Sequence, residues 1–243
     1  MIFTMAAAFG AGNLIGKIFG MNWKLTNLLS ISTAICGGSA VAALGPVIKA
    51  KDEDVAYAIS STFIFDILTV VLIPWIGISL NMSDTGYGLW VGTAVNDTSS
   101  VVAAGYAFSE LAGNTAVIVK LTRTLFIIPF VLIFSFITER LETKSEVAHG
   151  RASVNLRKIF PYFIILFLVV VIFSSTGIIP NALIPAFSKT SKFCMVMALS
   201  AIGLKTSFGD IKNIGFKPMI LGFIIDTLVV FVSIGVQVVT GRF

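Results

Sequence analysis

The sequence has little charge: Asp, Glu, Lys and Arg make up 12% of its 243 residues, whereas a soluble globular domain has about 25%. It has one histidine, His149, and two cysteines, Cys36 and Cys194. Both cysteines lie in apolar stretches, so they predict neither a disulfide framework nor a metal site. We therefore expect no metal, no cofactor and no enzyme activity. No basic residues cluster, which argues against nucleic acid as a partner.

Hydrophobic residues are abundant, at 56% of the chain. Long apolar stretches recur along the whole length, and each approaches the ~20 residues that a helix needs to cross a bilayer. The net charge of +5 is typical of a membrane protein with basic cytoplasmic loops. The composition predicts an all-α, polytopic membrane protein, with residues 1–243 forming one transmembrane domain in the lipid bilayer.

Two apolar stretches are interrupted by small and hydroxylated residues. Residues 33–45 read TAICGGSAVAALG, and residues 92–105 read GTAVNDTSSVVAAG around one acid, Asp97. A lipid-facing helix gains nothing from such residues at its middle, whereas a broken helix that lines a solvated site does, because its opened backbone groups need partners. We expect a helix break in each stretch.

The remaining sequence gives the expected order of elements. Full spans are expected at 55–80, 115–137, 159–178 and 219–239, with part of a span at 2–16, a short one at 193–204 and interrupted segments at 25–48 and 89–108. Turns are expected at 81–88 and 109–114. The polar loop 138–158 has five Lys or Arg, which places it in the cytoplasm. Stretch 2–16 is short and has no basic residues before it, so we expect it to be the inner part of a span in a longer domain.

An offset of sixty residues relates the two interrupted stretches. Nine of 35 positions between 33 and 67 match their counterparts, where this composition would give roughly three by chance. The repeat units are 25–80 and 85–137, followed by C-terminal spans in 159–240. If both interrupted segments turn back, twelve Lys or Arg lie in the cytoplasm and three outside, against ten and five if both cross. The first arrangement predicts inverted repeats, as in many secondary transporters.

The residues at the two breaks are candidates for contact with a substrate. They are Gly37, Gly38, Ser39, Asn96, Asp97, Thr98, Ser99 and Ser100. Their hydroxyls and backbone N–H groups would face a substrate or ion at a half-helix N-terminus. The alternative is structural, since Asp, Ser and Thr cap helices and Gly-Gly allows a turn.

Lys120 and Arg123 lie one helical turn apart inside an expected span. Lys120 can extend to the membrane surface. Arg123 lies deeper, and because an intramembrane Arg costs at least ~2.5–3.5 kcal/mol, we expect it to face a polar cavity. If Asp97 pairs with one of these cations, a positive charge remains near the break and favours an anion. Asp66 and Asp226 lie in the middle of expected spans. Each either forms a hydrogen bond to a neighbouring helix or binds a coupling H⁺ or Na⁺. Asp97 is a third candidate for binding the coupling ion.

Four stretches resemble a known family, the YeiH-type or UPF0324 proteins of bacterial inner membranes, whose members are described as sulfate exporters. The stretches are ICGGSAVAALGPVIKAKDEDVAYAI (35–59), GLWVGTAVNDTSSVVAAGYAF (88–108), VIVKLTRTLFIIP (117–129) and MALSAIGLKTSF (197–208). Family members usually have further spans before the point where this chain begins, and usually have His where this chain has Asn96. The resemblance implies kinship with the cation/proton antiporter and anion transporter group and its discontinuous helices.

Three functions follow as hypotheses. The first is a secondary transporter in the bacterial inner membrane that exports sulfate or a similar small anion, with Lys120 and Arg123 in the anion site. The second is an H⁺ or Na⁺ antiporter or channel with no anion substrate. The third is an intramembrane enzyme, for which Ser99 and Lys120 are the conceivable dyad. Assembly as a homo-oligomer stays open.

Overall fold

In a computed structural model of this chain, residues 1–148 and 216–241 are described, together with scattered residues between 166 and 197. The expected spans 159–178 and 193–204 and residue Cys194 lie outside the described residues, apart from those scattered positions. The chain divides into two compact units, Met1–Ile127 with Phe208–Phe243, and Ile128–Ser207. All candidate site residues belong to the first unit.

The described residues form helices and no strand. The helices are α1 (Ile2–Ile18), α2 (Trp23–Ala34), α3 (Gly38–Val47), α4 (Asp52–Ser79), α5 (Asp84–Ala94), α6 (Thr98–Phe108), α7 (Glu110–Thr124), α8 (Ile127–Ala148) and α13 (Lys217–Thr240). By length and composition, three helical stretches of the described residues could cross a membrane. They are Asp52–Ser79, Lys217–Thr240 and Glu110–Leu141, which consists of α7 and most of α8. The all-helical prediction holds for this part of the chain.

Two expected boundaries were wrong. The expected turn 109–114 is reduced to Ser109, because its hydroxyl accepts from Ala112 N at 3.1 Å and starts α7 directly. The expected loop 138–158 begins as helix, since α8 continues to Ala148. The span expected at 115–137 is divided by a two-residue turn between α7 and α8. Both expectations rested on the polar residues of these stretches. In the first stretch, Ser109 caps a helix, and in the second, the helix continues beyond the apolar segment.

Both predicted helix breaks are present. The first tip, residues 35–37, separates α2 from α3. There Gly37 has φ +68°, a left-handed conformation that glycine adopts without a steric penalty. The second tip, residues 95–97, separates α5 from α6 and consists of extended backbone at Val95 and Asp97.

The chain reverses at the first tip. Lys24 Nζ, at the start of α2, donates to Lys49 O, just beyond α3, at 2.7 Å. A continuous helix would separate these residues by ~37 Å at ~1.5 Å per residue. We call α2 and α3 the first hairpin.

The chain also reverses at the second tip. Tyr87 Oη donates to Ala104 O at 3.0 Å, and the Tyr87 ring stacks on Phe108 with centroids 3.9 Å apart. Residues 87 and 104 would be ~25 Å apart along a continuous helix. We call α5 and α6 the second hairpin, so both interrupted segments turn back, as the charge count predicted.

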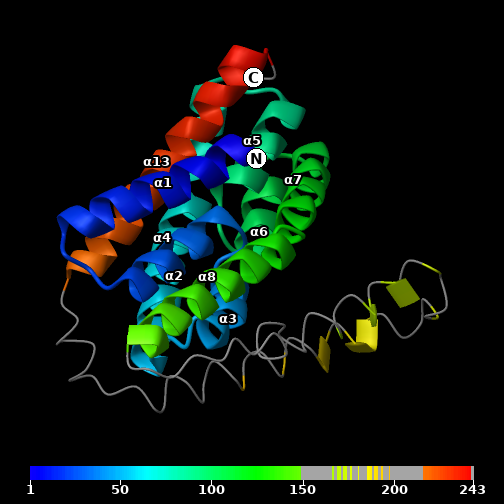
Figure 1. The fold of residues 1–243 in the computed structure, drawn as a ribbon. Helices are drawn as coiled ribbons and strands as arrows, with labels where there is room; N and C mark the ends of the chain where they lie inside the picture. The colour runs from blue at the N-terminus through cyan, green and yellow to red at the C-terminus, as the bar shows by residue number, and fades with distance from the viewer. Residues whose placement is uncertain are drawn as a thin grey trace. The chain divides into compact units, whose positions relative to one another are not determined.

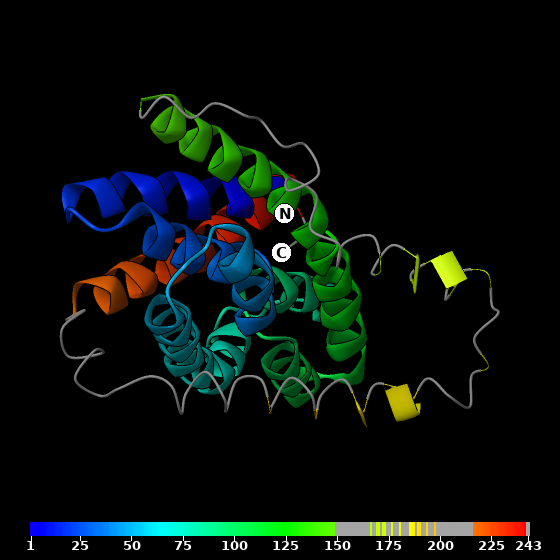
Figure 2. The same ribbon diagram turned by 60° about the horizontal axis from the view of Figure 1, so that its bottom comes forward.

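The two hairpins meet at their tips. A Cβ placed on Gly37 would lie 3.6 Å from Asp97 N and 3.7 Å from Asn96 C. Helix α13 lies beside α1 in both ribbon views (Figures 1 and 2), and its Val230 O accepts from Trp90 Nε1 of α5 at 3.3 Å. Two segments from opposite ends of the sequence thus pack beside the hairpins.

Five lysines of the first unit lie at helix ends on one side, away from the tips that Lys120 binds. Lys24 contacts the residue after α3, and Lys217 lines a cavity of about 300 Å³ together with Gly20, Asn22 and Asp54. Lys17, Lys49 and Lys51 flank these helix ends. We call this the lysine end, and the positive-inside rule predicts that it faces the cytoplasm.

Helix α7 packs closely on the second hairpin because glycines face it. A Cβ on Gly88 would lie 2.6 Å from Ala112 O, and a Cβ on Gly92 would lie 2.7 Å from Ala116 O. A step of four residues along α5, from Gly88 to Gly92, matches a step of four residues in the same direction along α7, from Ala112 to Ala116. Helices α5 and α7 therefore run parallel. Small residues allow this close approach, as is common between helices in membranes.

We predict that Gly92→Leu destabilises the protein, because its side chain would overlap Ala116 O and Val119 Cβ. Overpacking of this kind costs ~1–3 kcal/mol. The thermal unfolding midpoint in detergent measures the effect. Gly235→Leu is the matched control, because nothing lies within 4 Å of its Cβ position; equal midpoints for the two variants would contradict the close α5–α7 contact.

Candidate functional site

Asp97 caps the helix that follows the second tip. Its Oδ2 accepts from Ser99 N at 2.8 Å and from Ser99 Oγ. This is the capping role that we considered for it, and it satisfies one of the free N–H groups at the start of α6. Asp97 is half-buried, so it remains within reach of solvent or an ion.

Asp66 binds the backbone of the second tip from α4. Its Oδ1 accepts from Asn96 N and its Oδ2 from Asp97 N, both at 3.1 Å. The side chain is buried, with 1% of its surface exposed. A carboxylate at the amide end of a half-helix is stabilised by the N–H groups and the helix dipole.

Lys120 binds the carbonyl groups of both tips. Its Nζ donates to Ile35 O at 2.6 Å and to Val95 O at 2.9 Å. These carbonyls occupy equivalent positions, sixty residues apart. Lys120 is fully buried, so it does not extend to the membrane surface.

Arg123 binds the last turns of α2 and α5. Its Nε donates to Ala34 O at 2.6 Å, its Nη1 to Thr93 O at 2.5 Å, and its Nη2 to Thr33 O. Thr33 and Thr93 are again sixty residues apart. Arg123 is also fully buried. We expected a polar cavity around it, but its donors instead satisfy carbonyls that end the two half-helices.

These contacts revise the expected pairing. Lys120 and Arg123 donate to backbone carbonyls, and Asp97 accepts from Ser99. A cation at a helix C-terminus offsets the partial negative charge of the dipole. The conceivable Ser99–Lys120 dyad is not assembled, because each side chain is engaged with another partner.

Asp226 connects both hairpins to α13. Its Oδ1 accepts from Thr33 Oγ1 at 2.5 Å and from Asn96 Nδ2 at 2.9 Å. The hydrogen bond to a neighbouring helix that we considered for this acid is therefore present. Asn96 is fully buried, and its Oδ1 has no hydrogen-bond partner among the described residues.

The amide ends of the half-helices are the accessible part of the site. Gly38, Ser39, Thr98 and Ser100 are half-buried and Ser99 is exposed, whereas Gly37 and Asn96 are buried. Ser39 Oγ contacts Cys36 Sγ at 2.8 Å. Gly37, Asn96 and Asp97 therefore lie where the tips meet, and the other predicted residues of the breaks lie in the first turns of α3 and α6. Lys120, Arg123, Asp66 and Asp226 bind the tips or the helix ends beside them.

Three hydroxyl residues of the site are not among those predicted from the sequence. They are Thr33, which binds Asp226, and Thr93 and Ser233, whose Oγ atoms lie 2.5 Å apart. Thr33 and Thr93 are a matched pair in the sixty-residue repeat. Ser233 lies seven residues after Asp226, which places both on one face of α13. The sequence therefore contains a signal for each of these residues, namely the sixty-residue match of the two threonines and the seven-residue spacing of Ser233 from Asp226.

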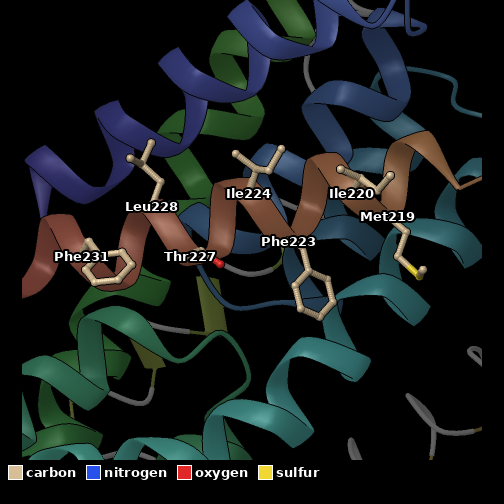
Figure 3. Close-up of a pocket in the computed structure, with 7 residues that line it drawn as sticks. All are labelled: Met219, Ile220, Phe223, Ile224, Thr227, Leu228 and Phe231. Carbon is tan, nitrogen blue, oxygen red and sulfur yellow. The ribbon is translucent and has the colours of Figure 1, made fainter.

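An apolar groove runs along the exposed side of α13. It is lined by Met219, Ile220, Phe223, Ile224, Thr227, Leu228 and Phe231 (Figure 3). Among the described residues that line it, Thr227 is the single polar one and none is charged, so these side chains give the groove no means of holding an ion. Among the described residues, no group of three His, Cys, Asp or Glu is placed to hold a metal.

The fold and site define a helical membrane protein with two broken, paired hairpins, and comparisons with known proteins give its family. The family model "Conserved hypothetical protein 698" matches residues 1–222. A UPF0324 membrane protein of Clostridium tetani is 60% identical over an alignment of 250 positions, which covers all of this chain and 72% of the relative. The UPF0324 membrane protein spr0034 of Streptococcus pneumoniae is 39% identical, over 99% of this chain and 72% of the relative.

The chain belongs to the UPF0324 membrane protein family. A Fusobacterium nucleatum member, FN0533, is 35% identical over all of this chain and 74% of its own length. No solved structure matches the chain significantly. The predicted family and the membrane-protein class are thus confirmed.

We predict that Arg123→Met strongly destabilises the protein. The carbonyls of Thr33, Ala34 and Thr93 would stay buried without their donor, at ~1–3 kcal/mol each. Arg123→Lys should fall between wild type and Arg123→Met, since an ammonium retains the charge but lacks the planar fork.

Thermal unfolding in detergent measures this order of stability. Lys17→Met is the matched control, because Lys17 is an exposed cation on α1. If Arg123→Met were as stable as Lys17→Met, the carbonyl contacts would not support the hairpins.

Proposed function

We propose that this protein is a secondary transporter that exports sulfate or a similar small anion across the bacterial inner membrane. The observation that carries this proposal is the orientation of the four half-helices. Lys120 and Arg123 hold the carbonyl ends of α2 and α5, so the accessible ends at the tips are the amide ends of α3 and α6.

An anion fits the amide ends for a physical reason. The first N–H groups of a helix lack intrahelical partners and carry a partial positive charge, which is why phosphate and sulfate bind there. Helix α3 begins at Gly38, and its N-cap residue Gly37 has no side chain with which to cap it. The hydroxyls of Thr98 and Ser100 would add neutral donors, and those of Ser39 and Ser99 would do so after leaving Cys36 O and Asp97 Oδ2.

Lys120 and Arg123 act in this proposal as positioning residues. Their donors hold both tips in place, and their charges raise the potential of the site without contact with the anion. This differs from our sequence-based hypothesis, in which Arg123 bound the anion directly.

The acids give the proposal a coupling mechanism. Asp66 and Asp97 accept from amides of the second tip and the first turn of α6, so their carboxylates compete with an anion for these groups. A proton or Na⁺ bound by either acid weakens that competition. Binding of the cation and of the anion then favour each other, as linkage requires.

We predict that replacing Ser99 and Ser100 together by Ala raises KM for sulfate by about tenfold, because two hydrogen bonds at ~0.5–1.5 kcal/mol each are lost. Uptake of labelled sulfate into proteoliposomes, with pH gradients of either sign, measures KM and the direction of coupling. Ser79→Ala is the control, since Ser79 is exposed near the end of α4. An unchanged KM would exclude the start of α6 from the anion site.

A second candidate function is H⁺ or Na⁺ antiport without an anion substrate. The specific observation in its favour is an excess of acids among the described residues at the tips, where Asp66, Asp97 and Asp226 outnumber Lys120 and Arg123. Asn96 Oδ1 is a further oxygen that could serve a small cation.

The antiporter hypothesis makes a separate prediction. Asp97→Asn should abolish Na⁺-dependent proton flux measured by a pH-sensitive dye in sulfate-free proteoliposomes, because the amide cannot release a proton. Asp84→Asn removes an exposed acid from the first turn of α5 and should leave the flux unchanged. Flux that persists in Asp97→Asn would argue against this acid as the coupling group.

A further inference from the structure

One buried oxygen at the tips has no hydrogen-bond donor. Asn96 is fully buried, and its side-chain Oδ1 accepts no hydrogen bond from any described residue. The great majority of buried polar atoms in folded proteins are hydrogen-bonded, so an exception indicates an ion, a proton or an ordered water beside it. Asn96 Oδ1 is therefore a candidate ligand atom that the hydrogen bonds of the tips leave unused.

The side chain of Asn96 faces the carboxylate of Asp226. Its Nδ2 donates to Asp226 Oδ1 at 2.9 Å. The opposite orientation of the amide would bring its oxygen against a carboxylate oxygen, and two acceptors would then meet. Since the oxygen and nitrogen of an amide are ~2.2 Å apart, Asn96 Oδ1 lies at most about 5 Å from Asp226 Oδ1. The unpartnered oxygen and the acid are thus within reach of one bound cation.

Asp226 has capacity for a further partner. A carboxylate offers about four acceptor sites, and the hydrogen bonds of the described residues use two of them, from Thr33 Oγ1 and Asn96 Nδ2. The side chain is buried, with 2% of its surface exposed. A buried carboxylate needs either a compensating charge or a proton. A cation shared between Asp226 and Asn96 Oδ1 satisfies the acid and the amide together.

The charges at the tips favour a monovalent cation. Asp66 from α4 and Arg123 from α7 act on Asp226, and Asp97 and Lys120 are the other described charged residues that bind there. Three acids against two cations leave one negative charge. One H⁺ or Na⁺ neutralises this remaining charge, whereas a divalent ion would leave a buried positive charge among these residues.

This site is distinct from the Asp97 cap. Asp97 is half-buried and accepts from Ser99 N, whereas Asn96 and Asp226 are buried and connect the second tip to α13. A cation bound by Asn96 and Asp226 would be shielded from solvent, one residue away from the accessible start of α6. Its charge would raise the potential at the amide N of Asp97 and so favour an anion there.

We propose that the Asp226 carboxylate and Asn96 Oδ1 together hold the coupling cation, one H⁺ or one Na⁺, between α13 and the second tip. The proposal rests on the proposed anion transport and deepens it by naming its cation site. As H⁺, the cation makes Asp226 a donor to Asn96 Oδ1, so that acid and amide exchange two hydrogen bonds. As Na⁺, it is bound by both oxygens, since oxygen ligands lie ~2.3–2.6 Å from Ca²⁺, an ion of similar radius.

Infrared spectroscopy of the purified protein tests the proton. A protonated carboxyl group has a C=O stretch that a carboxylate lacks. We expect a carboxyl band near neutral pH that disappears in Asp226→Asn and moves to higher frequency in Asn96→Ala, which loses the hydrogen bonds of the amide. Asn27→Ala is the matched control and should leave the band unchanged. Asn27 is a buried asparagine of α2 whose Oδ1 accepts from Asn13 and whose Nδ2 donates to Trp23 O.

Binding of radiolabelled Na⁺ to the same protein, in choline chloride, tests the sodium ion. We expect saturable binding whose affinity falls at least about tenfold in Asp226→Asn and Asn96→Ala, since even changes around the ligands of a metal site cost ~10–100-fold. Asn27→Ala should retain the wild-type affinity. One of the two signals is expected in the wild type, and either variant assigns it to the site if the other variant does not fold.

Two results would overturn the proposal. Wild-type protein could show neither a carboxyl band nor Na⁺ binding, which would leave Asn96 Oδ1 to an ordered water, or its signal could be unchanged in both Asp226→Asn and Asn96→Ala. A cation bound at this site without sulfate flux in proteoliposomes would instead count against the proposed function alone. Sulfate flux that stays coupled to a pH or Na⁺ gradient in Asp226→Asn would overturn the coupling role while the proposed function stands.

Discussion

The site depends on two buried cationic side chains that donate hydrogen bonds to the carbonyl ends of two half-helices. Each break leaves carbonyl groups without intrahelical partners in a segment where water is scarce. Lys120 and Arg123 supply donors to both breaks at once. Because the carbonyls of residues 33 and 93 share Arg123, and those of 35 and 95 share Lys120, the same contacts also join the two hairpins.

This arrangement separates the two polarities of the half-helices. The carbonyl ends are buried with the cations, and the amide ends carry the hydroxyl residues and the acids Asp66 and Asp97. An anion would bind the same few backbone N–H groups that the acids Asp66 and Asp97 accept from, and a bound cation would act on those acids. That overlap makes coupled transport a physically economical hypothesis for this member of the UPF0324 family.

Helix α13 gives both hairpins a common partner. Asp226 accepts from Thr33, and Ser233 contacts Thr93, so two residues on one face of α13 bind one threonine of each hairpin. The packing of α13 beside α1, from the two ends of the sequence, completes this support (Figure 1). Side chains from α4, α7 and α13 thus hold the tips in place.

The sequence by itself determined the helical membrane class, the two breaks and the candidate residues, because hydrophobic length and the small polar residues at each break act locally. It did not determine what the charges contact. Arg123 was expected in a polar cavity and Asp97 beside a cation, yet the former binds carbonyls and the latter caps α6. Only the tertiary structure decided these partners, since Arg123 and its acceptor Thr33 O are ninety residues apart in sequence and meet through hairpin reversal and helix packing.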